Sequence, residues 1–248
     1  MDTSILERLL DATERKRSVV LATRLRDGRQ ALLFEHTSES GIEALGRGGG
    51  EVDADEWPID AARRALAEDR TLLHDEGGDE ILLRPYNPPV RLFVIGAVHV
   101  AQPLVTIAAA AGLDVRIVDP RTAFATEDRF PGVRLARDRP FDLLRDAALD
   151  HRSAVVALTH DAKIDDPALI AALESTAFYI GALGSRTTHE KRLQRLRERG
   201  VPDEALRRIR APIGLDIGAR TPGEIAVAIV AELVQQLRRA DSSEGARP

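Results

Sequence analysis

The feature that most constrains the fold is a regular alternation of strand-like and helix-like segments after residue 90. Five short segments are almost entirely apolar, as expected of strands that are covered on both faces. They span residues 91–95, 115–119, 133–135, 153–159 and 177–183. Segments with helical periodicity lie between and after them, at 99–111, 141–149, 167–175, 188–199 and 221–239. This alternation predicts an α/β fold with a doubly wound, mostly parallel sheet and right-handed crossovers.

The first 88 residues follow a different pattern and predict a smaller N-terminal α/β domain. Its expected elements are helices over 2–16 and 57–69, a hairpin over 17–36, and strands at 71–74 and 80–85. The glycine-rich stretch 46–50 is expected to be a flexible loop. Three prolines within residues 85–89 cannot continue a helix or a central strand. We therefore place a domain boundary there, which gives domains 1–88 and 89–248.

Composition excludes several classes of function. The chain has no cysteine, which rules out disulfides, thiolate metal ligands and a cysteine nucleophile. A net charge of −5, with 35 basic and 40 acidic residues spread along the chain, argues against a nucleic-acid surface. No stretch approaches the roughly 18 consecutive apolar residues of a membrane span, and the acidic N-terminus is unlike a signal peptide. We expect a cytoplasmic protein without a membrane span or a nucleic-acid partner.

The first strand of the predicted parallel sheet runs into a degraded dinucleotide-binding fingerprint. Where a Rossmann fold reads G-x-G-x-x-G, this chain has Gly96, Val98 and Ala101. Asp119 follows Gly96 by 23 positions, close to the spacing of a ribose-binding carboxylate, and His99 lies where an imidazole can donate to a phosphate. Val98 places a branched side chain where the phosphates would pass. The other interpretation is that Gly96 and Asp119 are packing residues in a fold whose ligand has changed.

Polar residues follow the ends of the other predicted strands, which face one crevice in an open parallel sheet. The turn from Gly181 to Arg186 is a candidate anion site, because glycines free backbone N–H groups and an arginine can clamp an oxyanion. A glycine turn capped by Ser185 needs no ligand, however, so a structural role stays open. The candidate cofactor-binding residues are Gly96, His99, Asp119, Arg121, Thr159, His160, Asp161, Gly181, Gly184, Ser185, Arg186, Gly214 and Asp216.

Known catalytic spacings are missing from the chain. It contains no H-E-x-x-H, no Cys/His metal spacing and no G-x-S-x-G, so we expect neither a metal site nor protease or serine hydrolase chemistry. No catalytic residue is assigned, and whether the chain catalyses a reaction stays open.

The last two-thirds of the chain resemble the XdhC/CoxI family, accessory factors of molybdenum hydroxylases such as xanthine dehydrogenase. The segments that carry the resemblance are VIGAVHVAQPL at 94–104, VDPRTAFATEDRFP at 118–131, VALTHDAKIDDPAL at 156–169, and YIGALGSRTTHEKRL with APIGLDIGARTPGEIAVAI. The resemblance implies a chaperone that binds molybdenum cofactor, a pterin with a dithiolene and a phosphate. It implies insertion of the sulfurated cofactor into a molybdenum hydroxylase apo-enzyme, with a cysteine desulfurase as a further candidate partner.

The chain also departs from this family, and other functions stay open. Members of the family usually have the sequence G-A-G-H-V after the first strand, and in this chain Val98 replaces the second glycine. The T-x-G-S-x-P-R segment and the G-G-C of the family's N-terminal half are absent, which indicates a divergent, shortened N-terminal domain. The main alternative is an NAD(P)-dependent oxidoreductase, or another component that accompanies xanthine dehydrogenase. Val98 and the lack of an evident proton donor besides His99 or His160 weigh against it. A scaffold that only contacts the hydroxylase is a third alternative. We expect a homodimer, because most soluble oligomers are two-fold.

Overall fold

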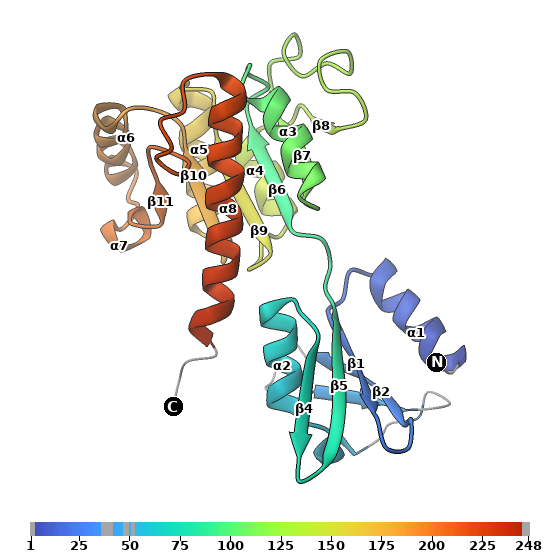
Figure 1. The fold of residues 1–248 in the computed structure, drawn as a ribbon. Helices are drawn as coiled ribbons and strands as arrows, with labels where there is room; N and C mark the ends of the chain where they lie inside the picture. The colour runs from blue at the N-terminus through green and yellow to red at the C-terminus, as the bar shows by residue number, and fades with distance from the viewer. Residues whose placement is uncertain (1–2, 36–41, 47–49, 51–52, 245–248) are drawn as a thin grey trace. The chain divides into compact units, whose positions relative to one another are not determined.

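The computed structural model describes residues 3–35, 42–46, 50 and 53–244. The chain divides into two compact units, Met1–Pro88 with Arg238–Pro248, and Pro89–Leu237. Each unit has its own β-sheet and its own hydrophobic core (Figure 1).

The first unit is built on a five-stranded antiparallel sheet in the order β3-β2-β1-β5-β4. Its strands are β1 (Val19–Arg24), β2 (Gln30–Glu35), β3 (Ile42–Leu45), β4 (Leu72–Glu76) and β5 (Asp79–Tyr86). Helices α1 (Thr3–Glu14) and α2 (Ile59–Glu68) cover opposite faces, and a 3-10 turn, η2 (Ala54–Glu56), precedes α2. Side chains alternate along a strand. Val19 therefore packs in the core with Ile5 of α1, while Val20 packs in the core with Ala62 of α2.

Two expectations for this unit need correction or lie outside the described residues. β5 continues through Pro85 to Tyr86 and pairs with β1, so the prolines do not stop this strand as predicted. β4 pairs with β5 only as far as Leu83, so beyond that residue β5 has a neighbour on one side only, where a proline is tolerated. Strand β3 was not predicted. Residues 47–49 of the expected glycine loop lie outside the described residues.

The second unit is built on a six-stranded parallel sheet in the order β11-β10-β9-β6-β7-β8. Its strands are β6 (Arg91–Ile95), β7 (Asp114–Val118), β8 (Arg134–Ala136), β9 (Ser153–Ala157), β10 (Tyr179–Ala182) and β11 (Ile209–Arg210). Its helices are α3 (Ala101–Ala110), α4 (Pro140–Asp146), α5 (Ala162–Leu173), α6 (Arg186–Glu198), α7 (Asp203–Leu206) and, as far as Leu237, α8 (Pro222–Glu244). Helices α3 and α8 pack on one face, and α4, α5 and α6 pack on the other (Figure 1). The predicted doubly wound parallel sheet is confirmed.

Helix boundaries in this unit follow their capping residues. α5 begins at Ala162 and not at Pro167, because the Asp161 carboxylate accepts a hydrogen bond from the Lys163 N–H and caps the helix five residues earlier than expected. α8 begins at Pro222, one residue after the predicted start at 221. Thr221 accepts a hydrogen bond from the Glu224 N–H, and Glu224 accepts one from the Thr221 N–H, which is a capping box. The short elements α7 and β11 were not predicted.

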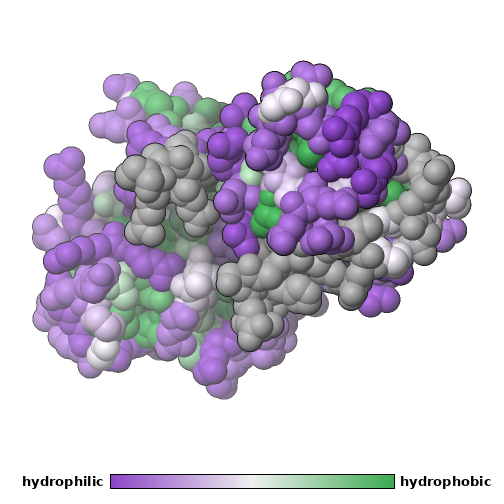
Figure 2. Space-filling view, turned by 90° about the horizontal axis from the view of Figure 1, so that it is seen from below, coloured by the Kyte–Doolittle hydropathy of each residue, from purple (hydrophilic) through white to green (hydrophobic). Residues whose placement is uncertain are grey.

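Figure 2 shows one face of the molecule, on which hydrophilic residues dominate and hydrophobic residues gather only in small groups. None of the helices in the described part of the chain combines the length and hydrophobicity needed to cross a membrane.

Candidate functional site

The sheet has a topological switch point between β6 and β9. From β6 the chain crosses to β7 on one side, and from β9 it crosses to β10 on the other. Ligands of open α/β sheets bind beside the carboxyl ends of the strands at such a point. The turns that follow β6, β7, β9 and β10 lie at this end of the sheet, and they contain most of the predicted site residues.

Gly96 is required by the contact between two of these turns. Its φ angle is +109°, and a Cβ atom at this position would lie 2.4 Å from the Thr159 Cγ2 atom. The Leu158 N–H donates to the Ile95 carbonyl at 2.9 Å and holds the same two turns together. A glycine is therefore needed here for packing, whether or not a ligand binds.

Asp119 joins the turn after β7 to the turn after β6. Its side chain has no exposed surface and accepts four hydrogen bonds, from the Ala97 N–H and from the Arg121 N–H, Nε and Nη2. Burial raises the pKa of Asp119, but the hydrogen bonds from Arg121 and Ala97 outweigh it, so the pKa is lowered. A carboxylate offers about four acceptor positions, and all are occupied. The spacing suggested a ribose-binding role, which this arrangement does not support, because a hydroxyl would have to displace one of these donors.

The turn after β9 is organised by a buried carboxylate that follows the strand in the sequence but is not among the candidate cofactor-binding residues. Asp165 is 2% exposed and accepts hydrogen bonds from the Thr159 hydroxyl and N–H and from the His160 N–H. Burial raises the pKa of Asp165, although these hydrogen bonds oppose the shift. His160 is exposed with a φ angle of 64°, and Asp161 caps α5. The hydrogen bonds to Asp119 raise the pKa of Arg121, and the charges of Asp161 and Asp165 add to this effect.

The turn after β10 leads into the N-terminus of α6. Ser185 is the N-cap residue, and its hydroxyl accepts a hydrogen bond from the Thr188 N–H at 3.2 Å. Arg186 is exposed, and its side chain has no ion pair or hydrogen bond with the described residues. Gly181 serves packing instead, because a Cβ there would lie 2.5 Å from the Ile213 Cδ1 atom. This turn thus offers free N–H groups and one free guanidinium to an anion.

A second arginine lies beneath this turn and was not predicted. Arg192 is 1% exposed, and its Nη2 donates to the Leu183 carbonyl at 2.8 Å. Its Nε and Nη1 have no hydrogen-bond partner. The basic segment that contains it looks like an exposed helix in the sequence, so only the packing of α6 against α5 reveals this buried charge.

The remaining predicted residues have other positions. His99 is exposed, and Val98 is half-buried and packs against the hydrophobic core, so its effect on a pyrophosphate stays a prediction. Gly214 approaches α8 closely, because a Cβ there would lie 3.1 Å from the Ala228 backbone. Its N–H donates to Glu232, which also accepts a hydrogen bond from the buried Tyr179 hydroxyl. Asp216 is exposed.

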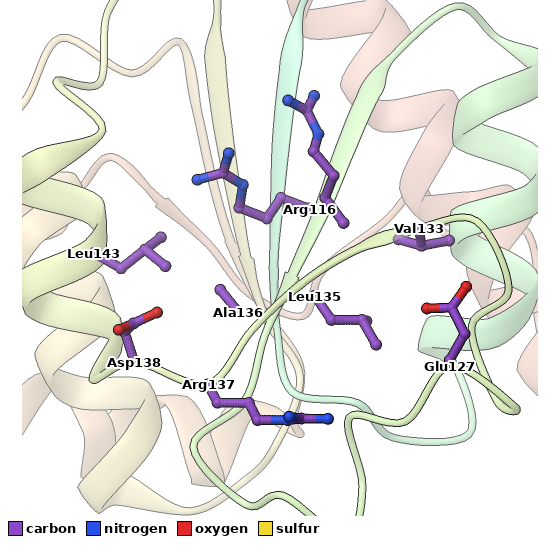
Figure 3. A pocket seen from close by; sticks show the side chains of 9 residues that line it. Arg116, Glu127, Val133, Leu135, Ala136, Arg137, Asp138 and Leu143 are labelled. Atoms are coloured by element: carbon purple, nitrogen blue, oxygen red, sulfur yellow. The ribbon is translucent and has the colours of Figure 1, made fainter.

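A cavity of about 650 Å³ lies away from the switch point, along the edge strand β8. Figure 3 shows Leu143 and Asp138 on one side of this strand and Val133 and Glu127 on the other. The cavity therefore wraps around an exposed sheet edge, and its lining includes none of the predicted site residues. A second cavity of about 340 Å³ lies beside α6 and is lined by His189, whose pKa is lowered by burial. We keep the switch point as the candidate site because the buried charges and free donors gather there.

A six-stranded parallel sheet in this order, with a glycine turn at its switch point, defines a Rossmann-type α/β domain. Residues 92–233 match the family model of the XdhC Rossmann domain, which is more than half of the chain. The chain therefore belongs to the XdhC family.

Three known proteins show the extent of the similarity. The molybdenum cofactor insertion chaperone PaoD of Escherichia coli is 36% identical over 148 residues, which are 60% of this chain and 40% of PaoD. A protein of Bacillus subtilis named as a probable xanthine dehydrogenase component is 32% identical over 187 residues, 74% of this chain and 54% of that protein. A crystal structure described as a xanthine dehydrogenase from Bacillus halodurans has a TM-score of 0.71 and 29% identity, covering 95% of this chain and 64% of that one. The chain spans less than two-thirds of the length of each of these relatives.

Proposed function

We propose that this chain is an accessory protein of a molybdenum hydroxylase and that it binds molybdenum cofactor as its cargo beside the switch point. The observation that carries the proposal is that the family match over residues 92–233 includes all four turns that gather there. One relative is named as a molybdenum cofactor insertion chaperone and another as a probable component of xanthine dehydrogenase, which supports the same role.

The residues at the switch point suit the phosphate and pterin parts of this cargo. The N-terminus of α6 and Arg186 provide hydrogen-bond donors and positive charge for a phosphate. Phe124, 42% exposed, stacks on Arg121 with 4.4 Å between the guanidinium carbon and the ring centroid, and it offers an aromatic surface to a flat pterin. The chain has no cysteine to ligate molybdenum. The proposal therefore places recognition at the phosphate and the pterin and not at the metal.

An NAD(P)-dependent oxidoreductase is the second candidate, favoured by the strand order and the Gly96 turn. The saturated carboxylate of Asp119 weighs against it, because the ribose of NAD normally depends on a free acidic side chain at the end of the second strand. We therefore rank it below the accessory role.

The proposal includes partners. A molybdenum hydroxylase apo-enzyme would receive the cargo, and a cysteine desulfurase would supply the sulfur, both in the cytoplasm. A homodimer is also proposed, and light scattering that finds a monomer at high concentration would reject it. Co-purification with a tagged hydroxylase apo-enzyme tests the first partner directly.

Thermal denaturation of the full chain with a panel of ligands separates the candidate functions. A ligand that binds only the folded state raises the unfolding temperature in proportion to the logarithm of its concentration relative to Kd. We expect molybdenum cofactor to raise the unfolding temperature and NAD and NADP to leave it nearly unchanged. Stabilisation by NAD and not by molybdenum cofactor would replace the proposed function with the oxidoreductase. Stabilisation by neither would favour the scaffold.

A further inference from the structure

We propose that Arg192 and the Gly184 turn form a binding site for a phosphate monoester, in which the buried guanidinium supplies the charge from beneath the turn. The identity of the ligand rests on the proposed function, since the phosphate of molybdenum cofactor is the group that would occupy this site. The site itself depends only on the residues of the turn, α5 and α6.

The first argument is the incomplete hydrogen bonding of Arg192. The residue is 1% exposed, yet only its Nη2 has a partner, the Leu183 carbonyl at 2.8 Å. Its Nε and Nη1 are buried without a partner. Burial lowers the pKa of Arg192, which means that the surroundings disfavour its charge. The large majority of buried side-chain polar atoms are paired, so two unpaired donors on one guanidinium point to an absent acceptor.

The second argument is that the neighbouring carboxylates are engaged elsewhere. Asp166 accepts hydrogen bonds from Arg195 at 2.8 and 3.0 Å, from Nε and Nη2. Asp165 accepts its hydrogen bonds from Thr159 and His160. Both carboxylates favour the charged form of Arg192 through space, but neither pairs with it. The guanidinium therefore remains available to an anion from outside the chain.

The third argument is the geometry of the turn above this guanidinium. Gly184 has a φ angle of +137°, and a Cβ there would lie 3.8 Å from the Arg192 Nη2 and 3.1 Å from the Thr188 Cγ2. Gly184 therefore lies between the buried arginine and Thr188 in the first turn of α6, a helix of 13 residues, with little room for a larger side chain. The first N–H groups of a helix and its dipole favour an anion at this end.

Together these features describe an anion site with donors on two sides. Helix N–H groups and Arg186 approach the phosphate from the solvent side, and Arg192 approaches it from below. Because Arg192 is covered and its Nη2 bonds the Leu183 carbonyl, contact with the phosphate requires an outward shift of the Gly184 turn, for which the glycine gives the backbone freedom. A bound phosphate would then supply acceptors for Nε and Nη1.

Calorimetric titration of the full chain with inorganic phosphate at constant ionic strength tests this site. Arg192→Met keeps the length of the side chain and removes its charge and donors. We expect it to weaken phosphate binding by about tenfold or more, the effect of a lost hydrogen bond to a charged group. Arg192→Lys should keep part of the affinity because it keeps the charge. Arg199→Met removes an exposed arginine just beyond the other end of α6 and should bind phosphate as the unmodified chain does.

The stability of the unliganded variant distinguishes this role from a structural one. Replacing an unpaired buried charge with an apolar side chain should leave the urea midpoint unchanged or raise it. An Arg192→Met chain that fails to fold, or that unfolds earlier while binding phosphate normally, would overturn the proposal. Unmodified chain that binds phosphate no better than chloride would overturn it as well.

A parallel titration with molybdenum cofactor separates this inference from the proposed function. If phosphate binding requires Arg192 but the cofactor does not bind the unmodified chain, the anion site stands and the proposed cargo is wrong. If the cofactor binds the unmodified and Arg192→Met chains equally well, the proposed cargo is supported and the proposed role of Arg192 is wrong.

Discussion

Replacing Asp119 with alanine should destabilise the Pro89–Leu237 unit by about 3 kcal/mol. The substitution leaves the buried Ala97 N–H without its acceptor, which costs about 1–3 kcal/mol. It also breaks the ion pair with Arg121, which is worth about 3–5 kcal/mol when both partners are buried. The Arg121 side chain is 32% exposed and can be hydrated after the change, so the second contribution is reduced well below that range.

Urea denaturation measures this effect, with an internal control. Circular dichroism reports on both units, whereas the fluorescence of the single tryptophan, Trp57, reports on the first unit. We expect Asp119→Ala to lower the urea midpoint of the second unit and to leave the midpoint of the Trp57 transition unchanged. Arg121→Ala leaves the fully buried Asp119 carboxylate without its charge partner, so it should cost at least as much as Asp119→Ala. A loss below about 1 kcal/mol for Asp119→Ala, or a smaller loss for Arg121→Ala than for Asp119→Ala, would refute the reasoning.

The difference in unfolding free energy between the unmodified and Asp119→Ala chains should depend on pH, because the pKa of Asp119 is lowered in the folded state. A carboxyl whose pKa is lower in the folded state contributes stability above its unfolded value of about 3.9. That contribution to stability is lost as the pH falls through the pKa that the carboxyl has in the folded state. The gap between unmodified and Asp119→Ala chains should therefore be constant near neutral pH and shrink below about pH 4. A gap that widens on acidification would contradict the assignment.

Three further predictions concern neighbouring residues. Gly96→Ala should lower the free energy of unfolding, measured with urea, by about 2–4 kcal/mol, because the new Cβ would lie 2.4 Å from the Thr159 Cγ2 at a φ angle of +109°. If Thr159→Ser does not restore part of this loss, backbone strain alone is responsible. Burial and Glu232 raise the pKa of Tyr179, so in an ultraviolet titration its ionisation should appear only as the protein unfolds, and Tyr179→Phe should remove that late component. Val98→Gly should bind NAD more tightly than the unmodified chain in calorimetry, and equal affinities would refute a steric block by the valine.

The parallel sheet could be predicted from the sequence because its signals are local. Strands covered on both faces are apolar, and the helices between them carry their own periodicity. Features that depend on a neighbouring strand or on a helix cap were predicted less well. Pro85 is accepted in β5 because β4 ends its pairing at Leu83. Pro167 was expected at the start of α5 but lies inside it, because the cap at Asp161 starts the helix earlier. Strand β11 has two residues, too few for any periodicity to be seen.

Charge at the candidate site was harder to predict than position. The spacing between Gly96 and Asp119 located the end of β7, but only the structure shows that all the oxygens of Asp119 are engaged. Arg186 and Arg192 lie six positions apart on one basic helix, and the sequence pointed to Arg186 but gave no sign that Arg192 is buried. The packing of α6 against α5 buries Arg192 and leaves Arg186 exposed.

The degraded fingerprint after β6 is therefore poor evidence for a dinucleotide. Gly96 is explained by its contact with Thr159, and Asp119 is explained by the donors it binds, so both would be needed in this fold without any nucleotide. Packing does not explain two unpaired donors on Arg192 in the same way, since a buried guanidinium with only one of its donor groups paired destabilises the folded chain. A residue whose burial destabilises the folded chain is the better guide to a ligand. Here that residue is Arg192, in the middle of α6, and not Gly96 or Asp119 at the first turns of the sheet.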